Sequence, residues 1–292
     1  MEFLVIGGTG TVGSQVVRGL LGRDHTVRVL SRTAERAALV PEGARGIIGN
    51  LRDPAGLGRA FQDVDGVFLC TPLAQDETEQ GLAAVRAARD AAPRKLVYMS
   101  VHNLEYGPQI PHFASKVPIE KAVKESGIPY TLLRPNNFFQ NDYWYQEAIV
   151  KHGIYPQPIG SVGVSRVDVR DIADMAVAAL TQPGHDGATY PVVGPDALTG
   201  ERVAEIWTRH LGREVRYGGD NLEAWSRQAR AMLPEWQVHD VAIMYAHFQR
   251  HGLIATAAEL ELQARALHHP PRSFESFAAE TAHAWGSRTA AS

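Results

Sequence analysis

Four side chains suited to acid–base chemistry follow the fifth predicted strand of the chain. Ser100 ends that strand, and His112, Lys116 and Glu120 follow at intervals of four residues. Residues spaced by four share one face of a helix, so His112, Lys116 and Glu120 are expected to project together. An imidazole that titrates near neutrality is a good proton donor at physiological pH. This segment is therefore the main candidate for chemistry.

Each of these residues also has a plain structural explanation, which the sequence leaves open. Lys116 and Glu120 are spaced as an ordinary solvated helix pair. Ser100 is of a type that forms turns at strand ends. In the same interpretation, His112 is a loop histidine without a role in the site. Tyr106, in the preceding loop, is a less constrained candidate for a proton donor and for the substrate pocket.

A glycine-rich turn opens the chain and predicts a nucleotide site. Residues 3–6 form a short apolar strand, and the turn runs directly into a segment with apolar residues at helical spacing. In such a turn Gly7 allows the tight bend, Gly10 lets the backbone approach a pyrophosphate, and Gly13 lets the helix pack closely on the strand. The first helical N–H groups then face the phosphates. The predicted contacts are Gly7, Thr9, Gly10, Thr11, Val12 and Gly13.

The residue after the second predicted strand bears on the choice of dinucleotide. An NAD site places Asp or Glu there to bind the ribose 2′-hydroxyl. This chain has Ser31 and Arg32, and a guanidinium at this point pairs with a 2′-phosphate. NADP(H) is therefore the predicted cofactor, the alternative being a solvated loop arginine. Later strand ends complete the predicted cofactor site with Asn50, Leu51, Thr71, Pro72, Lys116, Pro135, Asn137 and Phe138.

The alternation of strand and helix signals predicts an α/β fold with a Rossmann-type, doubly wound parallel sheet. Strands are expected at about 2–6, 26–30, 45–48, 66–70, 95–99 and 129–133, and helices at about 77–92, 113–126 and from Asp168 to Leu180. After residue 135 the regularity fails. Residues 1–135, with 161–195, are predicted to form the nucleotide domain. Residues 136–160 and 196–292 are predicted to form a smaller, mostly helical substrate lobe.

Composition narrows the possible partners. The chain has 292 residues, of which 45% are hydrophobic and 21% charged, and 29 Lys and Arg against 32 Asp and Glu give a net charge of −3. Without clustered basic residues, nucleic acid is not an expected partner. Cys70 stands alone, so no disulfide forms within the chain, and no targeting or membrane segment is recognised. We expect a cytoplasmic protein that acts on a small molecule, with a homodimer possible.

No metal site is predicted. His247 and His251 have the spacing of a metal-binding pair, and His239 precedes them by eight residues. No nearby cysteine or carboxylate completes a zinc-like set. The aromatic run after the sixth strand, in contrast, suits a substrate wall or a buried core. Phe139, Tyr143 and Trp144 are its candidate pocket residues.

Taken together, these motifs resemble the NmrA-like branch of the short-chain dehydrogenase/reductase superfamily. The resemblance rests on the turn at 7–13, Ser100, Lys116 with Glu120, the stretch 126–135, Ser165–Ala173 and Pro271–Phe277, and it covers nearly the whole chain. Tyrosine-dependent members use Ser, Tyr and a Lys four residues later. Ser100 and Lys116 match that pattern, but His112 occupies the tyrosine position.

The resemblance implies an NADP(H)-dependent oxidoreductase that reduces a small carbonyl or conjugated substrate. In the NmrA-like branch the lysine alone is the suggested acid–base group and ribose anchor, which gives this role to Lys116. Ser100 would polarise an oxygen and His112 would be an auxiliary donor. Two alternatives remain at this stage. One is a non-catalytic NADP(H) sensor or regulatory protein, and the other is an epimerase or lyase with tightly held cofactor.

Overall fold

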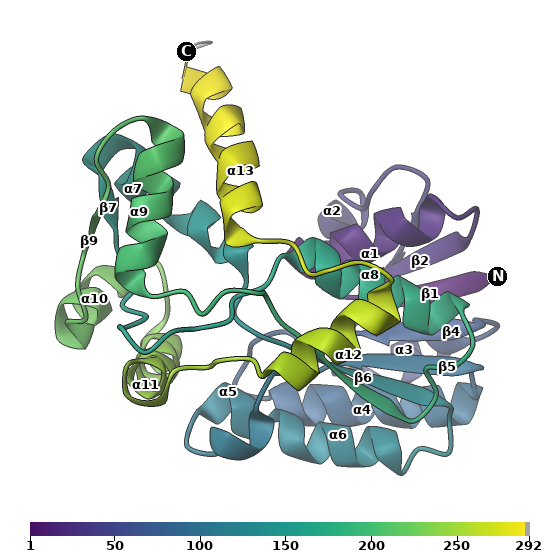
Figure 1. Cartoon of the computed structure of the whole chain (residues 1–292). Helices are drawn as coiled ribbons and strands as arrows, with labels where there is room; N and C mark the ends of the chain where they lie inside the picture. Colours follow the sequence, from purple (N-terminus) through teal and green to yellow (C-terminus); the bar gives the residue numbers. More distant parts are fainter. Residues whose placement is uncertain (290–292) are drawn as a thin grey trace.

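A seven-stranded sheet forms the centre of the computed structural model, which describes residues 1–289 (Figure 1). All its strands run parallel, in the order β3-β2-β1-β4-β5-β6-β8. The order changes direction between β1 and β4, where doubly wound sheets bind ligands at the carboxyl edge. The strands are β1 (Glu2–Ile6), β2 (Thr26–Ser31), β3 (Arg45–Ile48), β4 (Gly66–Leu69), β5 (Lys95–Met99), β6 (Tyr130–Pro135) and β8 (Ala188–Val192).

Helices cover both faces of this sheet, and each face has its own buried core. One face carries α1 (Thr11–Leu21) and α8 (Val169–Thr181), which pack on each other (Figure 1). The other carries α3 (Pro54–Phe61), α4 (Glu77–Ala91) and α6 (Lys116–Lys124). The short α2 (Ala34–Ala37) follows β2. Because both faces are buried, the strands are continuous apolar runs rather than alternating ones.

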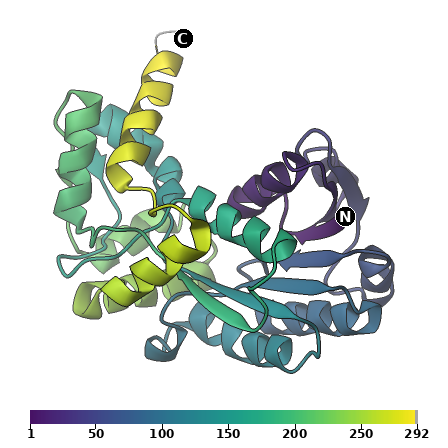
Figure 2. The same ribbon diagram turned by 45° about the vertical axis from the view of Figure 1, so that its right-hand side comes forward.

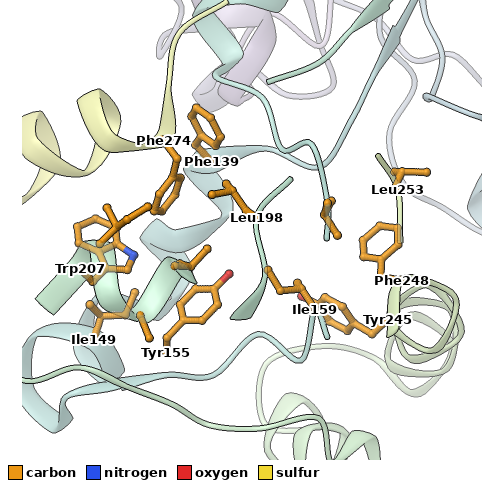
Figure 3. Close-up of a cluster of buried hydrophobic side chains, with 14 of the residues drawn as sticks. Phe139, Ile149, Tyr155, Ile159, Leu198, Trp207, Tyr245, Phe248, Leu253 and Phe274 are labelled. Atoms are coloured by element: carbon orange, nitrogen blue, oxygen red, sulfur yellow. The ribbon is translucent and has the colours of Figure 1, made fainter. Parts of the chain in front are cut away.

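A third core lies beside the sheet, in what we call the lobe (Figure 2). Its centre is aromatic: Trp207 stacks on Trp285 with ring centroids 4.8 Å apart, and Phe139 packs against Phe277. Phe139 also packs against Phe274 (Figure 3). The lobe elements are η2 (Phe139–Tyr145), α7 (Gln146–His152), α9 (Gly200–Leu211), α10 (Leu222–Ala229), α11 (Glu235–His251), α13 (Phe274–Thr289) and the two-stranded sheet of β7 (Ile154–Tyr155) and β9 (Arg216–Tyr217).

The predicted parallel α/β architecture is confirmed, and the strand positions agree within one or two residues. Asp168 caps α8 as expected, because its side chain accepts a hydrogen bond from the N–H of Arg170. The β7–β9 ladder was not predicted. Its strands have two residues each, too few to show any periodicity.

The prediction of one helix from Phe113 to Ser126 is wrong. The segment is divided into α5 (Pro111–Ala114) and α6, with Ser115 between them. Pro118 has no N–H to donate to the carbonyl of Ala114, and this missing bond accounts for the interruption. His112 and Lys116 therefore belong to two short helices.

The helix α12 (Ala257–Leu267) also differs from expectation, which assigned residues 196–292 to the lobe. It packs against α8 and β8, and Gln263 accepts a hydrogen bond from the N–H of Val193 at 2.7 Å. The chain thus returns to the sheet between the lobe helices α11 and α13 (Figure 2). Among residues 1–289, no helix is both long and apolar enough to span a membrane.

Candidate functional site

The N-terminus of α1 is open to an anion. Gly7 has a φ of +79°, which glycine adopts without strain. A Cβ on Gly13 would lie 2.2 Å from the Gly7 carbonyl oxygen, so only glycine allows this close packing of helix on turn. Gly10 is exposed at the N-cap, and neither a capping side chain nor an acidic residue occupies the first turn. The first N–H groups of α1 therefore remain available to a phosphate.

The other residues predicted in this turn differ in what they expose. Thr9 is half-buried and Thr11 is exposed, whereas the side chain of Val12 belongs to the core between α1 and the sheet. Val12 can therefore offer a ligand its backbone but not its side chain.

The end of β2 has the features expected of a ribose-phosphate site. The Ser31 hydroxyl is buried and has no hydrogen-bond partner in the part of the chain that the structure describes. Arg32 is exposed, and within residues 1–289 no hydrogen bond or ion pair occupies its guanidinium. A buried polar atom without a partner and a free cation beside it both suit a bound phosphate sugar.

Asn50 and Leu51, predicted as part of the cofactor site, are already engaged in the protein. The side-chain oxygen of Asn50 accepts the N–H of Arg52 at 3.0 Å, forming a local turn. The Leu51 side chain is buried in the core under β4 and α3. Their remaining surface toward a nucleotide is backbone and the Asn50 amide.

A cleft of about 280 Å³ opens where the carboxyl ends of β4, β5 and β6 face α11 of the lobe. It brings together most of the residues predicted for chemistry and for the nicotinamide end of a cofactor. Those that line it are Thr71, Ser100, His112, Lys116, Pro135, Asn137, Phe138 and Trp144. Pro72 is exposed next to Thr71.

Lys116 is held by a carboxylate that sequence reasoning missed. Its ammonium pairs with Glu77, the first residue of α4, whose side chain is 1% exposed. Glu77 also accepts hydrogen bonds from the hydroxyls of Thr71 at 2.6 Å and Ser115 at 2.9 Å. The alternative of a solvated Lys116 paired with Glu120 is therefore wrong. An acidic residue that opens a helix directly after β4 was the available signal.

Glu120 instead serves Arg134. The Arg134 guanidinium donates to both Glu120 oxygens, at 2.9 and 2.8 Å. Burial favours the protonated carboxyl, but the bonds from Arg134 outweigh it and lower the pKa of Glu120 below its ordinary value. The nearby Ser100 hydroxyl is buried in the cleft wall without a hydrogen-bond partner among the described residues.

His112 lies against Asp240, a buried residue of α11. The imidazole Nδ1 is 2.6 Å from Asp240 Oδ1, and the His112 backbone N–H points to the same oxygen at 3.4 Å. The ring of Phe113 meets the imidazole edge-on, with centroids 5.0 Å apart. No sequence pattern pointed to Asp240.

Two further phenols line the cleft: Tyr145 belongs to the aromatic run weighed as a substrate wall, and Tyr245 was missed. Tyr145 and Tyr245 come from η2 and α11, and burial raises the pKa of both side chains. They therefore remain protonated across the physiological range. The Tyr245 hydroxyl donates to Gln157 at 3.3 Å, and Tyr145 accepts from the Trp225 indole at 3.4 Å.

The four residues predicted for the substrate pocket are not all in the cleft. Trp144 lines the cleft with 61% of its surface exposed. Phe139 is fully buried in the lobe core, against Phe274, and does not reach the cleft (Figure 3). Tyr143 lines a separate hollow next to Thr11 and α13. The side chain of Tyr106 is outside the described part of the chain.

The histidines weighed as metal ligands have other partners. His247 Nδ1 lies 2.8 Å from the amide of Gln109, and its ring packs on His251. A different group, Asp171, Asp174 and His269, has ligand atoms close together. Arg272 already pairs with both of its carboxylates, which accounts for their proximity.

Comparison with known proteins places this geometry among relatives. The NmrA-like family model matches residues 2–278. The chain is 36% identical to an NAD(P)H azoreductase of Xenophilus azovorans over 97% of its length and 99% of that protein. It is 35% identical to a (4-alkanoyl-5-oxo-2,5-dihydrofuran-3-yl)methyl phosphate reductase of Streptomyces griseus, over 97% and 98%. Its fold matches the quinone oxidoreductase QOR2 of Escherichia coli, solved with NADPH, with a TM-score of 0.83, 22% identity and coverage of 96% and 99%.

Proposed function

This chain belongs to the NmrA-like family, and we propose that it is an NADP(H)-dependent reductase of a small, neutral, conjugated organic molecule. The observation that carries the proposal is the cleft at the carboxyl edge of the sheet. It joins Lys116, His112 and Ser100 to a wall of aromatic and aliphatic side chains. The two reductases that share more than a third of their residues with the chain support the same reaction class.

The residues present fit a dinucleotide. The first turn of α1 would hold the pyrophosphate, and Arg32 with Ser31 would hold the 2′-phosphate end. Thr71, Pro135, Asn137 and Phe138 lie farther along the same edge and would border the nicotinamide end. When bound, NADPH supplies a hydride to the substrate.

The protein's own part is to place the acceptor and to supply a proton. Lys116 and His112 are the two basic side chains among the described residues of the cleft wall, and the buried Ser100 hydroxyl beside Glu120 is the group proposed to polarise a substrate oxygen. Lys116 is the proposed ribose anchor and main proton source, with His112 as auxiliary donor. Glu77 keeps the ammonium at the cleft floor, since it is buried and fixed by two hydroxyls.

The lining favours a neutral and flat substrate. Of the side chains that line the cleft, Glu77, Lys116 and His112 are the ones that carry or gain charge, and Glu77 is already paired. Aromatic residues supply much of the remainder, namely Phe113, Phe138, Trp144, Tyr145, Trp225, Tyr245 and Phe248. Stacking on such rings favours conjugated acceptors over small hydrophilic ones.

A panel of acceptors tests the proposal. Purified protein is mixed with NADPH and, in turn, a quinone, an azo dye, an enone and an aldehyde, and NADPH absorbance is followed. We expect oxidation with at least one conjugated acceptor and none with the Gly10→Val variant. Tight NADPH binding without oxidation by any acceptor would contradict a reductase and favour the non-catalytic sensor.

A further inference from the structure

The lobe places one buried carboxylate, that of Asp240, against His112 of the cleft wall. Asp240 is 4% exposed, although it belongs to a helix whose neighbouring positions 239 and 241 are less buried. Its hydrogen bonds among the described residues both go to His112, from the ring Nδ1 and from the backbone N–H. Burying a carboxylate costs free energy of folding unless the group is paired, and the contact with His112 offsets this cost for Asp240.

The contact determines the state of the imidazole. A carboxylate only accepts hydrogen bonds, so the Nδ1 that lies 2.6 Å from Oδ1 must carry a proton. Nε2 has no hydrogen-bond partner within residues 1–289, and His112 lines the cleft. The second ring nitrogen is therefore the one left to meet a substrate.

We infer that Asp240 is the positioning residue of His112: it fixes the Nδ1–H tautomer and the ring plane, and so presents Nε2 to the cleft. The inference rests on the proposed function in that Nε2 exchanges a proton with the substrate. Protonation of Nε2 gives an imidazolium whose Nδ1–H stays bonded to Asp240, and release of that proton returns the neutral Nδ1–H form. No bond between His112 and Asp240 breaks in this cycle.

The arrangement divides the proton donor between two parts of the molecule. His112 belongs to α5, which follows β5 of the sheet, whereas Asp240 belongs to α11 of the lobe (Figure 1). The two residues are 128 positions apart in the chain. The tautomer of His112 is therefore fixed by the packing of α11 against α5.

Nitrogen NMR of the unliganded protein tests the tautomer directly. The ¹⁵N signals of His112 are assigned as those that disappear in His112→Phe, and their shifts report which ring nitrogen is protonated. We expect neutral His112 of the unaltered protein to carry its proton on Nδ1. A neutral His112 protonated mainly on Nε2 would overturn the inference, and this arm needs no variant of Asp240.

Asp240→Leu removes the acceptor while keeping a similar volume. We expect the His112 signals to move toward the mixture of tautomers of a free imidazole. The matched control is Gln237→Leu, which alters a cleft-lining residue of the same helix and should leave the His112 signals unchanged. Unchanged His112 signals in Asp240→Leu would also overturn the inference.

Kinetics separate positioning from mere support of the fold. With an active acceptor, Asp240→Leu should lower kcat by about 10²-fold, the cost of a misplaced group, and leave the KM for NADPH unchanged. The double variant with His112→Phe should lose no more than His112→Phe alone, because both changes disable one unit. Losses that multiply would overturn the inference. If no acceptor is reduced, the proposed function fails, and the NMR arm still decides the role of Asp240.

Discussion

The ammonium of Lys116 and the carboxylate of Glu77 form an ion pair at the floor of the cleft. The Glu77 side chain is 1% exposed and that of Lys116 is 12% exposed, so water screens the pair only weakly. Lys116 thus has a structural partner in addition to its proposed contact with the ribose. Its replacement should affect stability as well as chemistry.

Lys116→Met is expected to lower the free energy of unfolding by about 3 kcal/mol, because it leaves a buried carboxylate without its counter-ion. Turnover should fall by about 10²–10⁴-fold, as is typical for loss of a general acid. Urea denaturation and steady-state kinetics measure the two effects.

The double variant Lys116→Met/Glu77→Gln is the control for that prediction. Removing both charges should restore most of the lost stability but none of the lost turnover. Recovery of turnover in the double variant would show that Lys116 acts on the fold alone.

Arg32→Ala should remove most of the preference for NADPH over NADH. A charge-assisted contact to a phosphate contributes about 1.5–3 kcal/mol, so the unaltered protein should prefer NADPH by at least about tenfold. Calorimetric titration with both nucleotides measures it. Arg45→Ala is a suitable control, since Arg45 is exposed but lies at the amino end of β3, whereas Arg32 follows the carboxyl end of the neighbouring β2. Equal affinities in the unaltered protein would exclude the role of Arg32.

The turn glycines should separate binding from folding. Gly10→Val should abolish binding of either nucleotide at a small cost in stability, because its Cβ would meet only the Gly7 carbonyl oxygen, at 3.2 Å, a tight contact that a small shift of the turn relieves. Gly13→Ala should instead destabilise the protein, since its Cβ would lie 2.2 Å from that same oxygen. Thermal melts and nucleotide titration of both variants check this contrast. It fails if Gly10→Val binds NADPH normally.

Phe139→Ala should affect stability, whereas Trp144→Ala should affect substrate binding. Phe139 is fully buried, and its truncation should cost about 3–5 kcal/mol of stability. Trp144 is 61% exposed at the cleft, so its truncation should mainly raise the KM for an aromatic acceptor. Denaturation midpoints and acceptor kinetics of the two variants test the pair. An unchanged KM in Trp144→Ala would remove this residue from the substrate site.

The free energy of unfolding should decrease as the pH is lowered, because of His102. It is 1% exposed, and burial lowers its pKa from 6.5 despite the opposing effect of the nearby Glu259 carboxylate. The unfolded chain therefore takes up a proton first, and the free energy of unfolding should decrease as the pH falls through 6.5 toward the lower folded pKa. Denaturation at about pH 7.5 and about pH 5.5 measures the slope.

His102→Gln should make that dependence shallower, since the side chain no longer titrates, while His185 and His247, whose pKa values burial also lowers, keep the remainder. His152→Gln should retain the full slope, because His152 is exposed at the end of α7. The same slope in all three proteins would mean that other groups are responsible.

The sequence predicts the sheet well because its signals are local. Short apolar runs between turn residues mark parallel strands buried on both faces, and the glycines of residues 7–13 are required by backbone geometry in the turn itself. The cofactor-binding edge and much of the cleft follow, since the carboxyl ends of adjacent parallel strands must meet.

The partners in the cleft could not be predicted in the same way. Glu77 reaches Lys116 across 39 residues, and Asp240 reaches His112 across 128. The first contact depends on how α4 and α6 pack side by side on the sheet, and the second on how the lobe packs on it. No local period in the sequence records either arrangement. The wrong prediction of Phe139 as a pocket residue has a similar cause, since the sequence of an aromatic run is alike whether it faces a cleft or a core.

The aromatic core of the lobe also determines when the molecule can be completed during synthesis. The chain is made from its N-terminus, and β8 must be available before the sheet has its last strand next to β6. The packing of Trp207 in α9 is completed only when α13, which is made later, supplies Trp285 to stack on it. The core of the lobe is therefore closed only after α13 has been made, and a truncation before α13 should yield a chain with an exposed, aggregation-prone apolar surface.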